Sequence, residues 1–486
     1  RQDLSCVLYD VLEVADCCGA KGVKVTLDER HHGVQSVLQP NLAEFQGPAL
    51  SVYLEGVTLT SDEIGHLLAA TAPYKIRGKV GRYGNGLQGI FNVTDMPLVL
   101  SGSSIYLFDP TGAILSTSLA NAQKAGAPVG RAYSFVGSDL PHRFKDQFAP
   151  LQPLDTTQGF YGTVLRLPLR TAAQAESARV HNVAVTIPQA MQLLADFQAH
   201  AAPSLAFLSH VGWLKGAVWQ PEGDKPCPLF NTLVLPKSSE AAERLVVDAK
   251  EWKKFSVSSL FGGSANTSKV FEIQLLSESF DIPDKEGAST HVDATVGAET
   301  PEDVQKGQSA RAPTVDVWMV ATSVGAGRTR DLAMDRKYLS SMLSPVGAVA
   351  FHVARDGKPI PYSSLHHRSN MSQPADLESH PTADCSEEDD DGSTEAPCGA
   401  REVASVPQHL FAPLPLGTGR DASVGTNLAK LPFHVMGHFA LERSAGRRLQ
   451  PLRDVPLGGG ATLERAEVLH GVWNKEMLAC LVQATA

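Results

Sequence analysis

Apolar residues recur at helical and strand spacing through the first 170 residues. Helical spacing from Leu4 to Ala15, followed by Gly19, predicts a helix over 3–18. Ser61 opens a second predicted helix, with Asp62 and Glu63 in its first turn. Short β-branched or apolar runs predict strands at 23–27, 49–54, 97–101, 103–108 and 160–168. This mixture predicts an α+β domain over residues 1–170.

The same patterns continue to the end of the chain. A predicted helix at 188–198 makes residues 171–202 a helical connector, and a second α+β domain is predicted over 203–486. Its expected strands are 204–210, 213–219, 228–235, 269–276, 313–321, 346–354 and 431–441, and its expected helices are 239–254, 331–342 and 463–482.

Two segments interrupt this second domain. Residues 278–306 and 363–402 contain few aromatic or large aliphatic side chains, and the second includes an acidic run at 384–391. Such segments bury too little apolar surface to offset the entropy lost on ordering. Both are therefore predicted to be disordered inserts.

Charge is concentrated in these inserts. The 486 residues have 42 Lys plus Arg and 52 Asp plus Glu, for a net charge of −10. Residues 278–306 hold −6 and residues 376–395 hold −9, which leaves the remaining chain at +5. A chain without a strong Lys/Arg surplus is not expected to coat nucleic acid, but a mildly basic body is compatible with an anionic ligand.

Composition excludes several other classes. No run of about 18 apolar residues is present, so no transmembrane helix is predicted. The seven cysteines are scattered and odd in number, which argues against a secreted disulfide framework and favours the cytoplasm. The chain begins with Arg1 inside a helical pattern, which predicts a fragment of a longer protein.

The strongest local signal is the segment Lys79-Val-Gly-Arg-Tyr-Gly-Asn-Gly86, which leads into a helical stretch. Closely spaced glycines allow backbone N–H groups to turn toward an anion, and nearby basic side chains add positive charge. The spacing is neither that of a Walker A loop nor that of a dinucleotide fingerprint. From these residues alone, an anion-binding loop and a plain glycine-rich turn both remain open.

No metal site is predicted. His434 and His438 are four residues apart, but their segment alternates like a strand and contains Gly437. At strand rise the two imidazoles would lie about 13 Å apart, too far to share one ion.

Several ordered blocks resemble the sacsin family. They are Leu12-Glu-Val-Ala-Asp-Cys-Cys-Gly-Ala20, Val25-Thr-Leu-Asp-Glu-Arg30, Gln46-Gly-Pro-Ala-Leu50, Lys79–Gly86, Val93-Thr-Asp-Met-Pro97, Ser101-Gly102, Phe108-Asp-Pro110, Asp146-Gln-Phe-Ala-Pro150 and Gly162-Thr-Val-Leu-Arg-Leu-Pro-Leu-Arg170. Sparser similarity continues at 431–441 and at Trp473-Asn474.

The resemblance implies a GHKL (Bergerat-type) fold, which is shared with the ninety-kilodalton heat-shock chaperones, gyrase and MutL proteins. In that fold helices lie on one face of a mixed sheet, and ATP binds between helices and sheet under a glycine lid. Family members are linked to chaperones and the proteasome, so the implied partners are chaperones or unfolded client proteins. ATP is the implied cofactor.

The resemblance also assigns positions in this chain. The position of the catalytic base falls on Asp10, and that of the Mg²⁺-binding Asn falls on Val14. The adenine-reading carboxylate falls on Glu55, in place of the family's Asp. The remaining implied nucleotide-binding residues are Asp16, Lys79, Gly81, Arg82, Gly84, Asn85, Gly86 and Thr163.

Val14 cannot bind Mg²⁺, and Mg²⁺ normally stabilises the charge on the ATP phosphates. Hydrolysis of ATP is therefore not expected. The preferred function is a sacsin-like chaperone or protein-quality-control module with a degenerate, non-hydrolysing ATP-binding fold. A weakly active Mg-ATP-dependent ATPase is the first alternative. A GHKL domain of the MutL or MORC type, acting on nucleic acid, is the second.

Overall fold

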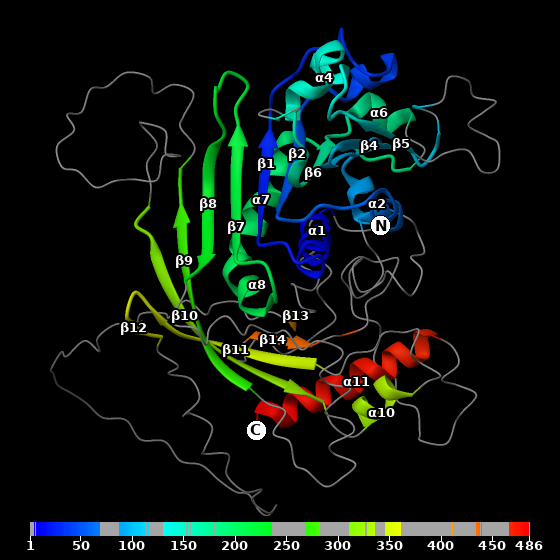
Figure 1. Ribbon diagram of the computed structural model, residues 1–486. Helices are drawn as coiled ribbons and strands as arrows, with labels where there is room; N and C mark the ends of the chain where they lie inside the picture. Colours follow the sequence, from blue (N-terminus) through cyan, green and yellow to red (C-terminus); the bar gives the residue numbers. More distant parts are fainter. Residues whose placement is uncertain are drawn as a thin grey trace, which may run out of the picture.

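The structure is a computed structural model (Figure 1). It describes residues 4, 6–68, 87–112, 114–115, 130–151, 154–155, 157–177, 180–235, 269–281, 311–325, 328–335, 346–360, 410–411, 434–437, 439 and 466–485. The predicted lid residues Lys79, Gly81, Arg82, Gly84, Asn85 and Gly86 lie outside these ranges. Most of both predicted inserts and the predicted helix at 239–254 also lie outside them.

The described strands form one 14-stranded mixed sheet, which curves strongly along its length (Figure 1). Its order is β13-β14-β11-β10-β9-β8-β7-β1-β2-β6-β3-β4-β5, with β12 paired to β11. Only the pairs β1–β7 and β13–β14 are parallel in this described sheet. The strands are β1 Gly22–Asp28, β2 Ala49–Glu55, β3 Leu98–Gly102, β4 Ser104–Phe108, β5 Gly130–Ser134, β6 Phe160–Pro168, β7 Trp213–Trp219, β8 Cys227–Val234, β9 Lys269–Ser279, β10 Thr314–Val324, β11 Val346–Arg355, β12 Lys358–Pro359, β13 Leu410–Phe411 and β14 His434–Gly437.

Helices pack on this sheet at several points. The α-helices are α1 Cys6–Cys17, α2 Ser61–Leu68, α4 Leu140–Arg143, α5 Lys145–Phe148, α6 Ala172–Ser177, α7 Ile187–Ala199, α8 Ala201–Phe207, α10 Arg328–Met334 and α11 Ala466–Thr485. Short 3₁₀ helices are η1 Pro40–Phe45, η2 Gln88–Asn92 and η3 Ala149–Leu151. No helix among the described residues is long and apolar enough to span a membrane.

The largest core lies between the sheet and helices α1, α2, α7 and α8. On α1 it takes up Val7, Val11 and Val14, and on β1 it takes up the alternating residues Val23, Val25 and Leu27. Gly19 ends α1 with a φ of +79°, a conformation that glycine adopts without steric cost. We call the sheet surface under these helices the helix face and the opposite surface the outer face.

A second core covers the outer face where β3 and β4 run. Leu98 and Leu100 of β3 pack there with Leu42 and Phe45 of η1 and with Phe148 of α5. Val99, between the two leucines, belongs instead to the core under α1. Both faces of β3 are therefore covered, and the arrangement is not simply a sheet with helices on one side.

The predicted α+β class is confirmed, and most predicted elements of the first 235 residues are present. One prediction is wrong: residues 204–210 do not form a strand, because helix α8 runs from Ala201 to Phe207. This segment is apolar on nearly every side and is buried almost completely, so its sequence lacks the period that separates helix from strand. The GHKL assignment stays a prediction.

The predicted division between residues 170 and 203 falls inside a continuous sheet. Strand β7 pairs in parallel with β1, from Gly22 opposite Trp213 to Asp28 opposite Trp219.

The first insert was predicted to begin at 278, but β9 continues to Ser279. Helix α10 begins at Arg328, three residues before the start of the predicted helix at 331–342.

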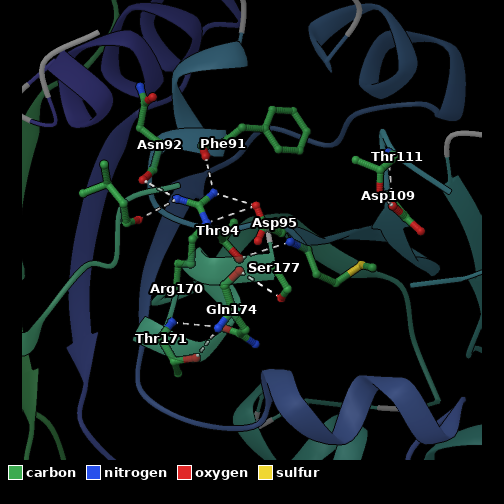
Figure 2. A network of polar contacts seen from close by, with 12 residues as sticks. Phe91, Asn92, Thr94, Asp95, Asp109, Thr111, Arg170, Thr171, Gln174 and Ser177 are labelled. Atoms are coloured by element: carbon green, nitrogen blue, oxygen red, sulfur yellow. Dashed lines mark hydrogen bonds and ion pairs between the residues drawn. The ribbon is translucent and has the colours of Figure 1, made fainter. Parts of the chain in front are cut away.

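A buried arginine links three segments of the first domain. Arg170 follows β6, and its side chain is 0% exposed. Its Nε and Nη2 donate to Asp95 Oδ1 at 3.0 and 2.7 Å. Its remaining N–H groups donate to the carbonyls of Phe91 and Asn92, and to that of Val183 (Figure 2). One side chain thereby holds η2, the loop at Asp95 and the segment that leads into α7.

We expect Arg170→Met to lower the free energy of unfolding by about 3 kcal/mol, because a buried ion pair and several carbonyls lose their partner together. Denaturant unfolding followed by circular dichroism measures this change. Arg143→Met is the matched control, because Arg143 pairs with Asp139 on the exposed surface and should contribute less than about 1 kcal/mol. Equal effects of the two substitutions would contradict the central position of Arg170.

Candidate functional site

Two of the positions that the family resemblance assigns on α1, Asp10 and Val14, are buried. Val14 is 1% exposed and lies within the largest core, and Asp10 is also buried. A valine side chain offers no oxygen to a metal ion, and Val14 is already surrounded by aliphatic neighbours. Among the described residues, no group of three or more His, Cys, Asp or Glu side chains could hold a metal ion.

Asp16 holds a loop of the protein itself. Its Oδ1 accepts hydrogen bonds from the backbone N–H groups of Ser209, His210 and Val211, at 3.0, 2.7 and 3.1 Å. This loop connects α8 to β7, so Asp16 ties the end of α1 to the strand that pairs with β1. The Asp16 carboxylate therefore has a structural use that spacing alone did not predict.

Glu55 lies on the outer face. Leu50, Val52 and Leu54 of β2 point into the core under α1, so strand alternation places Glu55 on the other side. Its Oε2 accepts a hydrogen bond from Trp213 Nε1 at 3.1 Å. Glu55 is thus separated by the sheet from Val14 and Asp10, with which an adenine-reading carboxylate would have to share a site.

Thr163 is on the helix face, but its hydroxyl bonds within the protein. Thr163 Oγ1 donates to the carbonyl of Val57 at 2.8 Å and lies 2.9 Å from Ser101 Oγ. Ser101 Oγ in turn accepts from the backbone N–H of Leu59 at 2.8 Å. This buried chain of hydrogen bonds fixes the segment after β2 against β3 and β6.

The described residues do not fit an Mg-ATP site. Val14 supplies no metal ligand, Asp16 is bonded to three backbone N–H groups, and Glu55 faces the wrong side of the sheet. The glycine segment cannot be compared, because its residues lie outside the described part. No chemical step through a nucleotide follows from this geometry.

A charged cluster at the end of β1 was not predicted. Asp28 accepts two hydrogen bonds from the Arg30 guanidinium, at 2.8 and 2.9 Å, and lies 3.1 Å from His32 Nε2. The guanidinium carbon of Arg30 lies 3.3 Å from the centre of the Trp219 ring, in a cation–π contact. Burial alone would raise the pKa of Asp28, but the bonds from Arg30 and His32 hold it well below the usual carboxyl range.

This cluster has only a weak sequence signal. The run Asp28-Glu-Arg-His-His32 directly follows a predicted strand, which suggests charge at a strand end. Trp219 comes close to Arg30 only because β7 pairs with β1, and that long-range pairing was not predicted.

The described residues form an α+β fold built on a mixed, mostly antiparallel sheet. A family model described as Sacsin domain matches residues 2–230. The human protein Sacsin (Homo sapiens) is 28% identical over 214 residues, which cover 42% of this chain and 4% of the human protein. Residues 2–230 therefore match the sacsin family, and the resemblance found from the motifs is confirmed over that region.

The matched region extends past residue 170. It includes β7, which pairs with β1, and the first half of β8. The sparser similarity predicted at 431–441 and at Trp473-Asn474 lies beyond it and stays a prediction.

The Asp28 cluster predicts a pH dependence of stability. The folded-state pKa of Asp28 is depressed below the ordinary value of 3.8, so its contribution is complete above that pH. As the pH falls further, the unfolded state takes up a proton first, and stability on the order of 2 kcal/mol is lost. Unfolding free energies measured from pH 7 to pH 2.5 should fall more steeply for the native protein than for Asp28→Asn. Parallel curves would contradict this assignment.

Proposed function

We propose that this chain is a sacsin-like protein-quality-control module whose nucleotide-binding fold has become a scaffold. The single observation that carries the proposal is Val14, packed in the core at the position where the family's Mg²⁺ ligand is expected. No small movement of the structure would bring a metal ligand to this position, because the neighbours of Val14 are also aliphatic.

The other matched positions support the same proposal. Asp16 and Glu55 each bond to another part of the protein, and these bonds hold β7 next to β1 and β2. Residues that would bind nucleotide in an active relative thus stabilise the sheet in this chain. We infer that chaperones or unfolded client proteins in the cytoplasm are its partners.

A weakly active ATPase is the second candidate, and one observation favours it. The segment 75–86 retains closely spaced glycines together with Lys75, Arg77, Lys79 and Arg82. Such a loop could still contact phosphates through backbone N–H groups and positive charge.

The first test measures client protection with and without nucleotide. We expect the chain to reduce light scattering by a heat-denatured model enzyme, to the same extent with Mg-ATP, with ADP and without nucleotide. Titration calorimetry with Mg-ATP should give no submillimolar binding, and phosphate release should equal the buffer rate. Protection that requires ATP, or measurable turnover, would favour the ATPase instead. No protection under any condition would remove the chaperone proposal.

The second test restores the missing ligand. We expect Val14→Asn to lower the free energy of unfolding by about 2–3 kcal/mol, because an amide enters an aliphatic core, and to leave Mg-ATP affinity unmeasurable. Val14→Ala is the matched control, since it creates space without adding a polar group. A gain in Mg-ATP affinity for Val14→Asn, absent in Val14→Ala, would show that a nucleotide cleft remains.

A further inference from the structure

A second buried arginine, Arg166, has no carboxylate bonded to it among the described residues. Arg166 lies on β6 and is 2% exposed. Its neighbours Leu165 and Leu167 point into the core under α1, so Arg166 points toward the outer face. There Nη1 donates to the carbonyl of Phe45 at 2.8 Å and Nη2 to that of Gly47 at 2.9 Å. Both acceptors are neutral.

Buried polar atoms without a partner occur on Arg166 and on the segment that Arg166 binds. Arg166 Nε has no hydrogen-bond partner within the described residues. Gln46, which lies between the two carbonyls that Arg166 binds, is also 2% exposed, and neither its Nε2 nor its Oε1 is bonded in this part of the chain. Buried polar groups are normally satisfied, so unused donors on adjacent segments indicate that something else binds them.

The charges nearby do not cancel. Asp28 is already bonded to Arg30 and His32, and its influence on Arg166 acts only through space. Burial and the charge of Arg30 lower the pKa of Arg166 to about 10, while Asp28 opposes that shift, so Arg166 stays protonated at neutral pH. Asp28, Arg30 and Arg166 together carry a net charge of +1, and a protonated His32 would increase it.

We propose that a small monovalent anion of the halide type binds beside Arg166, with Arg166 Nε and the Gln46 amide as its donors. A water molecule would satisfy those donors but would leave the buried positive charge uncompensated. A dianion would exceed the net charge of +1. The bound ion would link the end of β1, the segment 45–47 and β6.

Thermal and chemical unfolding in different salts test the proposal. At constant ionic strength, replacing sodium gluconate by sodium bromide should stabilise the protein. Above the dissociation constant, the equilibrium constant for unfolding should fall about tenfold for each tenfold rise in bromide. Line broadening of the chloride-35 NMR signal should appear with protein and disappear on addition of excess bromide.

Two substitutions locate the effect. Arg166→Met and Gln46→Met should each remove or weaken the bromide response, whereas Arg311→Met, which alters an exposed ion pair with Asp281, should keep it. If Arg166→Met does not fold, the bromide response of Gln46→Met and the chloride NMR signal still test whether an anion binds. Equal stability in gluconate and bromide, no chloride broadening, or an unchanged response in Gln46→Met would each overturn the proposal and leave ordered water as the occupant.

Discussion

The guanidinium of Arg170 is the contact on which the arrangement of the first domain depends. Its N–H groups bind Asp95 and three backbone carbonyls, while its own backbone N–H donates to Val93 and its carbonyl accepts from Val185. Three parts of the chain therefore meet at Arg170. They are residues 91–95, strand β6 and the segment that leads into α7. Because the side chain is removed from water, each of these bonds must be kept in the folded state.

Other charged residues between α1 and β7 form similar contacts. Asp16 binds the loop before β7, Glu55 binds Trp213 at the start of β7, and Asp28 positions Arg30 over Trp219 at the end of β7. Carboxylates thus fix this strand at both ends. Asp16, Glu55 and Asp28 are therefore each engaged in contacts within the protein.

Local periodicity predicted α1, β1, β2, β6, β7 and β8 well, because in each the side-chain pattern matches one buried face. It failed at 204–210, where helix α8 (Ala201–Phe207) is apolar on nearly every side. The orientation of Glu55 could have been predicted from the inward-pointing Val52 and Leu54. The contacts of Asp16 and of Arg30 could not, since they depend on the parallel pairing of strands nearly 190 residues apart.

That pairing has a consequence for synthesis. Strand β1 lies inside the sheet with β2 on one side, and its other edge is filled only by residues 213–219. During translation, the edge of β1 that β7 later fills therefore stays open, with unpaired N–H and C=O groups, until residues 213–219 have been made. Until then, that edge is available for pairing with another chain.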